Sequence, residues 1–186
     1  MRQLPEEYVI TDVTEDDIPA LVAADRAASM LFEDTGLISP EALTDTIPHD
    51  AFAEAIKAEH VIVARHIEGY AVGFTLTSLR GKGLYLDQIS VHPEHGQCGI
   101  GTELMMHLLQ DAEDRKLPYV TLSTFRDLPW NAPFYASMGF REIHRNKFDE
   151  FMFEIEEAQR PLMDVAARCF MRRRVRAPLF RRKKPA

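Results

Sequence analysis

The stretch Ser90–Leu109, SVHPEHGQCGIGTELMMHLL, runs from a strand-like apolar segment through a loop into an amphipathic helix. Two glycines, Gly99 and Gly101, stand where that helix begins, although glycine inside a helix costs roughly 1 kcal/mol relative to alanine. A helix N-terminus attracts anions, and glycines let a phosphate approach the backbone N–H groups closely. The stretch therefore predicts a phosphate-binding loop, with a merely flexible strand-to-helix turn as the alternative.

Two familiar phosphate-binding loops are excluded. The segment GQCGIGTEL lacks the Lys-Ser/Thr pair of a P-loop, and Leu104 stands where the third glycine of a dinucleotide-binding motif would be. A phosphate bound here would be held by main-chain N–H groups, without a lysine and without an evident magnesium site.

Strands and helices are mixed along the chain on both sides of this stretch. β-branched and aromatic runs predict strands, and polar caps followed by apolar residues at helical spacing predict helices. Strands are expected at 8–13, 61–66, 70–79, 84–91 and 118–125, from 140 onward, and over 165–172. Helices are expected at 15–29, from 39, at 49–60, 100–112 and 131–138. This order, with a strand–helix–strand crossover at its centre, predicts an α/β or α+β fold around one sheet.

Charge is distributed unevenly along the 186 residues. The net charge is −7, yet the part of the chain from Gln159 onward holds ten Lys/Arg and one Asp. An acidic body repels nucleic acid and attracts cations, so nucleic acid is a disfavoured partner. Residues 175–186 are predicted to be a basic, disordered tail, because blocks of like charge repel one another. Binding of nucleic acid or anionic lipid by this tail, or its folding back onto the body, is the alternative.

The remaining composition favours one domain in a reducing compartment. No apolar run approaches the ~18 residues that a membrane span requires, and the start, MRQLPEEYVI, lacks a secretory signal pattern. Cys98 and Cys169 are too few for a disulfide framework. We therefore expect a cytoplasmic protein without a membrane span. A homodimer stays open.

Two segments, LDQISVHPEHGQCGIGTELM and WNAPFYASMGFRE, together resemble the core of the GNAT superfamily of acyl-CoA-dependent N-acetyltransferases, with a match over Leu84–Glu142. The resemblance implies a single acetyltransferase-like domain over residues 1–174, built on a mixed, mostly antiparallel sheet flanked by helices. It also implies that the glycine-bearing loop binds the pyrophosphate of acetyl-CoA. The sequence departs from the family's Arg/Gln-x-x-Gly-x-Gly pattern, because Gly96 replaces the first residue.

The resemblance also implies which residues contact acetyl-CoA. Main-chain groups of the strand before the loop would pair with the pantetheine arm and supply a donor to the oxyanion, and loop amides would hold the phosphates, with the Thr102 hydroxyl as a further donor. Asn131 would contact the CoA arm, and Tyr135 would donate a proton to the departing thiolate, its alternative being a packing aromatic. The implied cofactor-binding residues are Ile89, Ser90, Val91, Gly96, Gln97, Cys98, Gly99, Ile100, Gly101, Thr102, Asn131 and Tyr135.

Asp87 is the candidate general base. A strand period of two places Tyr85, Asp87, Ile89 and Val91 on one face, and a carboxylate on an otherwise apolar face is costly unless it is used or paired. Asp87 would accept a proton from the amine or bind a cationic amine. An ion pair with a neighbouring strand is the alternative.

The acceptor side is less well marked. Arg126, Asp127 and Trp130 follow a strand and precede the Tyr135 segment, so they are predicted to rim the acceptor pocket, with a plain surface loop as the alternative. The acidic body favours a small cationic amine. His92 and His95 lack further ligands at usable spacing, so no metal is expected.

The resulting prediction is an N-acetyltransferase that transfers an acetyl group from acetyl-CoA to a primary amine, by direct attack in a ternary complex. The alternative is a non-catalytic acyl-CoA-binding or scaffold module of the same fold.

Overall fold

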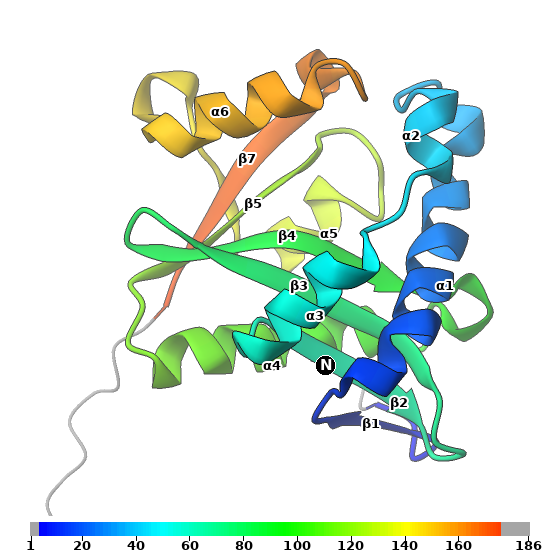
Figure 1. The fold of residues 1–186 in the computed structure, drawn as a ribbon. Helices are drawn as coiled ribbons and strands as arrows, with labels where there is room; N and C mark the ends of the chain where they lie inside the picture. The colour runs from blue at the N-terminus through cyan, green and yellow to red at the C-terminus, as the bar shows by residue number, and fades with distance from the viewer. Residues whose placement is uncertain (1–3, 176–186) are drawn as a thin grey trace, which may run out of the picture.

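The computed structural model describes residues 4–175. Within these residues, one seven-stranded sheet has the order β1-β2-β3-β4-β5-β7-β6 (Figure 1). All neighbouring strands are antiparallel except β4 and β5, which are parallel. The predicted mixed, mostly antiparallel sheet with flanking helices is confirmed. The predicted basic tail lies outside the described residues, apart from Val175.

Most predicted elements occur close to their expected positions. The strands are β1 (Tyr8–Thr11), β2 (Val61–His66), β3 (Ala71–Arg80), β4 (Gly83–Val91), β5 (Tyr119–Phe125), β6 (Arg141–Glu142) and β7 (Arg168–Arg174). The α-helices are α1 (Ile18–Ser29), α2 (Pro40–Thr44), α3 (His49–Lys57), α4 (Ile100–Asp114), α5 (Ala132–Ser137) and α6 (Glu150–Gln159).

The C-terminal third differs from the expectation. Helix α6 was not predicted, because the exposed Phe153 beside the buried Phe151 and Met152 blurs the helical spacing of apolar residues. Strand β7 begins at Arg168 rather than at residue 165, since a 3-10 turn occupies Val165–Ala167. Strand β6 has only two residues.

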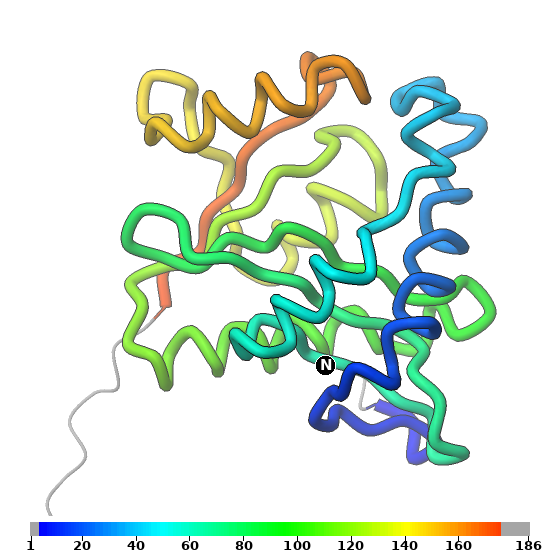
Figure 2. Tube along the Cα trace, in the orientation of Figure 1, coloured from blue at the N-terminus to red at the C-terminus, as the bar shows by residue number. Residues whose placement is uncertain are grey.

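Helices cover both faces of the sheet. Helix α4 packs its buried Leu104, Met105 and Leu108 against one face, while α1 and α3 cover the other, where the rings of Phe52 and Phe74 lie 5.1 Å apart. The trace in Figure 2 shows β5 and β7 running side by side, with α6 across their upper ends.

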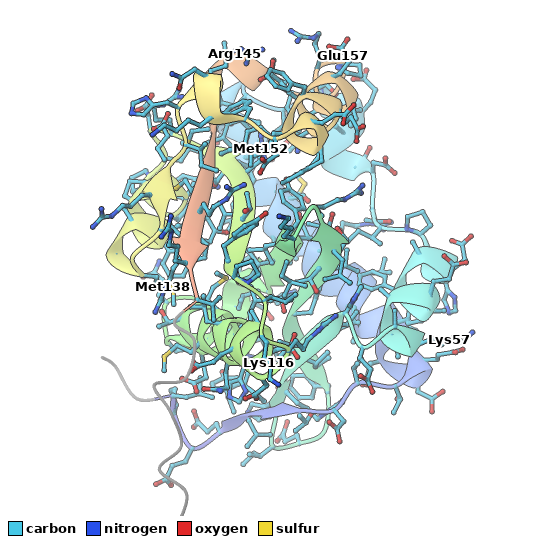
Figure 3. The ribbon with its side chains drawn as sticks, turned by 90° about the vertical axis from the view of Figure 1, so that its left-hand side faces the viewer. Lys57, Lys116, Met138, Arg145, Met152 and Glu157 are labelled. Carbon is cyan, nitrogen blue, oxygen red and sulfur yellow. The ribbon has the colours of Figure 1, made fainter. Side chains whose placement is uncertain are left out.

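Helix α6 extends the layer formed by α1 and α3. Met152 is fully buried with Tyr85, Phe151 and Phe170. In Figure 3 the labelled Met152 lies between α6 and the sheet, whereas Arg145 and Glu157 lie at the outer surface. Both faces of β7 are therefore covered, which explains why consecutive residues of this strand are buried.

A β-bulge interrupts β4 at Asp87. Leu76 of β3 pairs with Gln88, but the next residue of β3, Thr77, pairs with Leu86, so Asp87 is the extra residue. A bulge bends its strand and reorients the side chain at the bulge. Here it reverses the alternation of faces along the second half of β4.

Strands β4 and β5 separate immediately after the bulge. Their pairing ends at Leu86 and Leu122, while both strands continue for several residues. Figure 1 shows the two strands diverging from their common start. The sheet is therefore open between β4 and β5 at their C-terminal ends.

At the other end of these strands, contact is so close that only glycine fits at position 83. A Cβ added to Gly83 would lie 2.3 Å from Tyr119 Cδ2 and 2.5 Å from Tyr119 O. Gly83→Ala is expected to lower the free energy of unfolding by about 1–3 kcal/mol, because the β5 backbone must shift. Urea denaturation measures this, with Gly101→Ala as the control, since a Cβ there meets only Phe134 Cζ at 4.0 Å. Equal stability of the two variants would contradict the prediction.

Candidate active site

The loop after β4 ends at an uncapped helix N-terminus. Gly99 precedes α4 with a φ of 102°, and Gln97 also has a left-handed φ of 60°. Gly99 has no side chain, and α4 has no side-chain cap hydrogen bond. Because the first N–H groups of a helix have no intrahelical acceptors, this end of α4 presents free donors and a partial positive charge to a ligand.

The surroundings of Gly96 and Gly101 differ in whether they leave room for a side chain. A Cβ on Gly96 would lie 3.0 Å from Pro93 O, so this position is constrained by the loop itself. A Cβ on Gly101 would meet only Phe134 Cζ at 4.0 Å. Packing therefore does not require glycine at 101, and the helix surface at this position is open. The Cys98 thiol donates to His95 O at 2.9 Å, which ties the loop together.

The open edge of β4 supplies main-chain groups to the same region. His92 N–H donates to Val72 O of β3 at 2.8 Å, and alternate residues of an antiparallel strand face the same neighbour, so Ser90 also pairs with β3. Ile89 and Val91 consequently direct their N–H and C=O groups away from β3, toward the gap beside β5. These groups are suited to binding an extended amide-bearing chain.

Asn131 and Tyr135 lie on the β5 side of this gap. Asn131 directly precedes α5, and its Nδ2 donates to Thr124 Oγ1 at 2.8 Å. Its Oδ1 is buried and has no hydrogen-bond partner among residues 4–175. An orphaned buried acceptor is costly, so this oxygen fits an N–H donor of a bound ligand, such as an amide of the pantetheine arm.

Tyr135 is packed among apolar residues but reaches the cleft. Its side chain is 7% exposed, its ring contacts those of Phe134 and Phe140, and it lines the cleft. Burial raises the pKa of its hydroxyl, against a smaller opposing effect of Arg168. The hydroxyl is therefore protonated at neutral pH and available to donate.

Asp87 faces the same cleft, which has a volume of about 440 Å³ and lies between α1, α2, β4 and β5. The Asp87 side chain is open to solvent in the cleft, yet the surrounding protein desolvates the carboxyl group and raises its pKa to about 6. Hydrogen bonding from Ser78 and the charge of Arg80 oppose this shift. No ion pair to Asp87 occurs within residues 4–175, so its carboxylate is available to a ligand.

The expected common face of β4 is wrong because of the bulge. Leu86, Ile89 and Val91 pack on the α4 side, whereas Tyr85 packs against α6. A strict period of two fails where an extra residue is inserted. The residues before and after Asp87 therefore alternate between the two faces of the sheet in opposite order.

A buried carboxylate on α1 was not predicted. Asp25 is 4% exposed and lines the cleft, and its Oδ1 accepts from Gln88 Nε2 at 2.7 Å and from Ser90 Oγ at 2.8 Å. The signal in the sequence was an acidic residue four positions after Leu21, on the apolar face of the helix. This network joins α1 to β4 directly after the bulge.

The three residues expected around the acceptor pocket are not brought together in the cleft. Arg126 pairs with Glu142 at 3.1 Å and lines a neighbouring pocket between β5, β7 and α6. Asp127 is exposed. Trp130 is 48% exposed and contacts the ring of Phe32, which lines the cleft.

Metal-binding groups and membrane-spanning helices were both sought among the described residues. No group of three or more His, Cys, Asp or Glu side chains gathers at metal-binding distances among residues 4–175. Across the same residues, no helix has the length and hydropathy of a membrane span.

Comparison with known proteins agrees with this geometry. The profile of the acetyltransferase (GNAT) family matches residues 28–140. The chain is similar in structure to the ribosomal-protein-S18-alanine N-acetyltransferase of Escherichia coli, with a TM-score of 0.64 and 16% identity over 96% of this chain and 99% of that one. It is also similar to the PaiA N-acetyltransferase of Thermoplasma acidophilum, solved with coenzyme A, with a TM-score of 0.67 and 14% identity over 90% and 98% of the two chains.

N-acetylglutamate synthase of Neisseria gonorrhoeae is similar as well, with a TM-score of 0.67 and 15% identity, over 91% of this chain but only 35% of that one. At these identities the structural likenesses establish the fold, while the family profile covers more than half of the chain. The chain therefore belongs to the acetyltransferase (GNAT) family, and it is an N-acetyltransferase that uses acetyl-CoA.

Proposed function

We propose that this N-acetyltransferase acetylates a small primary amine by direct attack on acetyl-CoA, with both substrates bound at once. The observation that carries the proposal is that Asp87, Tyr135 and the open edge of β4 line one cleft. A base, a proton donor and an oxyanion donor thus surround the position of a thioester placed between β4 and β5.

Acetyl-CoA would be held mainly by main-chain groups. The N–H groups at the start of α4, from Gln97 to Thr102, would bind the diphosphate. Ile89 and Val91 would pair with the pantetheine arm, and Asn131 Oδ1 would accept from one of its amides. This arrangement supports the proposal because Ile89 and Val91 lie beyond the last β4–β5 pair, and because Asn131 Oδ1 and the start of α4 at Gly99 have no capping or hydrogen-bonding side chain within residues 4–175.

The reaction needs proton transfers at two places: the nitrogen loses two protons between the ammonium ion and the amide, and the CoA thiolate gains one. An alkyl ammonium group has a pKa near ~10, so Asp87 would accept its proton, directly or through water. The amine nitrogen then attacks the carbonyl carbon, a C–N bond forms, and a main-chain N–H of β4 stabilises the oxyanion. The C–S bond breaks as the carbonyl re-forms, and Tyr135 donates its proton to the CoA thiolate. The second proton of the nitrogen then passes to the Tyr135 oxygen, directly or through water, which leaves an amide and restores the hydroxyl.

The charges of the cleft support a cationic acceptor. Asp25, Asp45 and Asp87 line it, and the protein as a whole carries a net charge of −7. An ammonium group would be attracted to these carboxylates before it loses a proton.

Release of CoA from acetyl-CoA in the presence of a panel of primary amines tests the proposal. Amine-dependent release, without an acetylated form of the protein by mass spectrometry, is expected. An intact acetyl-CoA complex that turns over none of the amines would instead favour the non-catalytic acyl-CoA-binding or scaffold module.

Gly101→Ala separates ligand binding from folding. The added Cβ meets no close atom, and alanine suits a helix better than glycine, so the free protein should unfold at the same temperature or higher. The methyl group would crowd the phosphate site and weaken CoA binding by about tenfold or more, which is ~1.4 kcal/mol. Thermal shift and calorimetric titration measure the two effects. Unchanged CoA affinity would remove this helix end from the binding site.

Tyr135→Phe is expected to lower kcat by roughly 10²-fold without changing CoA affinity, because it removes only the proton donor. The hydroxyl has no hydrogen-bond partner within residues 4–175, so its loss leaves no group orphaned and thermal stability should be retained. Tyr119→Phe is the matched control, since it makes the same change outside the cleft, where the hydroxyl accepts from Lys82 N–H at 3.3 Å. Equal kcat values for Tyr135→Phe and the wild type would exclude this role.

The pH dependence of kcat/KM should report Asp87. A carboxyl group with a pKa of about 6 is protonated below that pH and unable to accept a proton, so kcat/KM should rise through pH 6 and then level off. Asp87→Asn should remove this rise and lower the plateau about 10²-fold. A profile that keeps the same rise in the variant would show that another group titrates.

A further inference from the structure

Arg168 lies at the junction of the cleft and the neighbouring pocket. It is the first residue of β7, opposite Phe125 of β5, and it lines both cavities. Its Nε donates to Ser123 Oγ at 3.1 Å and its Nη2 to Ser123 O at 2.8 Å. The guanidinium lies 4.8 Å from the centre of the Phe125 ring. Backbone, hydroxyl and ring contacts thus fix the position of this side chain.

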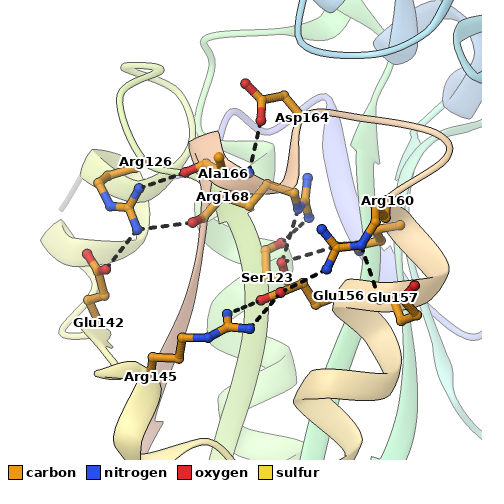
Figure 4. Close-up of polar contacts among 11 residues, drawn as sticks. Ser123, Arg126, Glu142, Arg145, Glu156, Glu157, Arg160, Asp164, Ala166 and Arg168 are labelled. Atoms are coloured by element: carbon orange, nitrogen blue, oxygen red, sulfur yellow. Dashed lines mark hydrogen bonds and ion pairs between the residues drawn. The ribbon is translucent and has the colours of Figure 1, made fainter.

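Arg168 is the one arginine of this region without a carboxylate partner among the described residues (Figure 4). The other arginines that line the neighbouring pocket are each paired with glutamate. These pairs are Arg126–Glu142 at 3.1 Å, Arg145–Glu156 at 2.5 Å, and Arg160 with Glu156 at 3.4 Å and Glu157 at 3.1 Å. The absence of a counterion therefore distinguishes Arg168 from its neighbours.

An unpaired cation in this position is unusual in energetic terms. The Arg168 side chain is only partly accessible to solvent, and burial lowers the pKa of its guanidinium, which nevertheless stays charged in proteins. A desolvated charge is normally compensated by an opposite charge. Two of its five N–H groups donate to Ser123, and Nη1 has no acceptor within residues 4–175. One N–H of Nη1 and the second N–H of Nη2 therefore form a planar fork that is available to an anion.

The cleft is therefore lined by opposite charges, those of Asp87 and Arg168. Both charges also act on the buried Tyr85 hydroxyl, whose pKa is raised mainly by burial, lowered by Arg168 and raised by Asp87. An ammonium group near Asp87 and an anionic group near Arg168 would satisfy both side chains. A guanidinium fork matches the planar geometry of a carboxylate.

We propose that Arg168 binds a carboxylate of the acceptor, so that the amine acetylated by this protein is a small molecule that also carries a carboxylate, such as an amino acid. The inference rests on the proposed function, which places the reacting amine at Asp87. A volume of about 440 Å³, shared with the thioester end of acetyl-CoA, suits a small acceptor.

The first experiment compares acceptors that differ only in the anionic group. The probes are L-alanine, L-leucine, L-glutamate and L-phenylalanine, each with its carboxamide and with the amine that lacks the carboxyl group. CoA release at saturating acetyl-CoA gives kcat/KM for each. For at least one set, the acid should exceed both neutral analogues by about 10- to 100-fold, the value of a hydrogen bond to a charged group.

The second experiment assigns this preference to Arg168. Arg168→Gln should lower kcat/KM for the acid by about 10- to 100-fold, mainly through KM, and leave the carboxamide and the affinity for acetyl-CoA unchanged. Arg168→Lys should retain part of the preference, since it keeps the charge and loses the fork. Arg160→Gln is the matched control, because Arg160 lines the neighbouring pocket but not the cleft.

Several results would overturn the inference. Acids and neutral analogues with equal kcat/KM in the wild type would do so while leaving the proposed function intact, and this comparison needs no variant to fold. An equal loss for acid and carboxamide in Arg168→Gln would show a structural role instead. Absence of turnover with every amine, despite acetyl-CoA binding, would remove the proposed function and the inference with it.

Discussion

The separation of β4 from β5 is the constraint on which the cleft depends. Pairing between the two parallel strands ends at Leu86 and Leu122, and the extra residue at Asp87 bends β4 at the same point. Main-chain groups that would otherwise complete the sheet are left for a ligand, in the centre of the molecule rather than at its edge. The network of Asp25 with Gln88 and Ser90 fixes the bent half of β4 against α1. Without this opening, Tyr135 and Asn131 would have no cavity to face.

Most of the fold and part of the candidate site could be predicted from the sequence, because the patterns that indicate them lie within short segments of the chain. Strand and helix patterns, polar residues at helix starts, and the glycines before α4 are encoded within a few residues. The bulge could not be read in this way, because it depends on how β4 pairs with β3, and the periodicity of β4 predicted the wrong faces. Helix α6 was not predicted because the apolar Phe153 lies on its exposed side and obscures the helical spacing of the buried residues. Arg168 was not singled out because the absence of a counterion is visible only in three dimensions.

The cleft and the adjoining loop present two kinds of charge to a ligand: partial charges of main-chain groups and full charges of side chains. The helix N-terminus and the main-chain groups of β4 carry partial charges that suit phosphate and amide groups. Asp87 and Arg168 carry full charges whose energies depend strongly on burial. The first set is suited to a coenzyme with an invariant structure, and the second to a variable substrate. Under the proposed function, such a division would place substrate specificity on a few side chains of β4 and β7 and coenzyme binding on the loop before α4.

Strand β7 lies inside the sheet, between β5 and β6, although it follows every other described element in the chain. During synthesis, the segments up to α6 therefore leave the ribosome with the outer edge of β5 unpaired. Such an edge is prone to association with other strands. The nascent polypeptide would assemble the coenzyme side of its cavity first and gain Arg168 only when residues 168–174 emerge. Pairing with β7 covers that edge, so the strand that brings Arg168 to the cleft also limits association of the polypeptide with other strands.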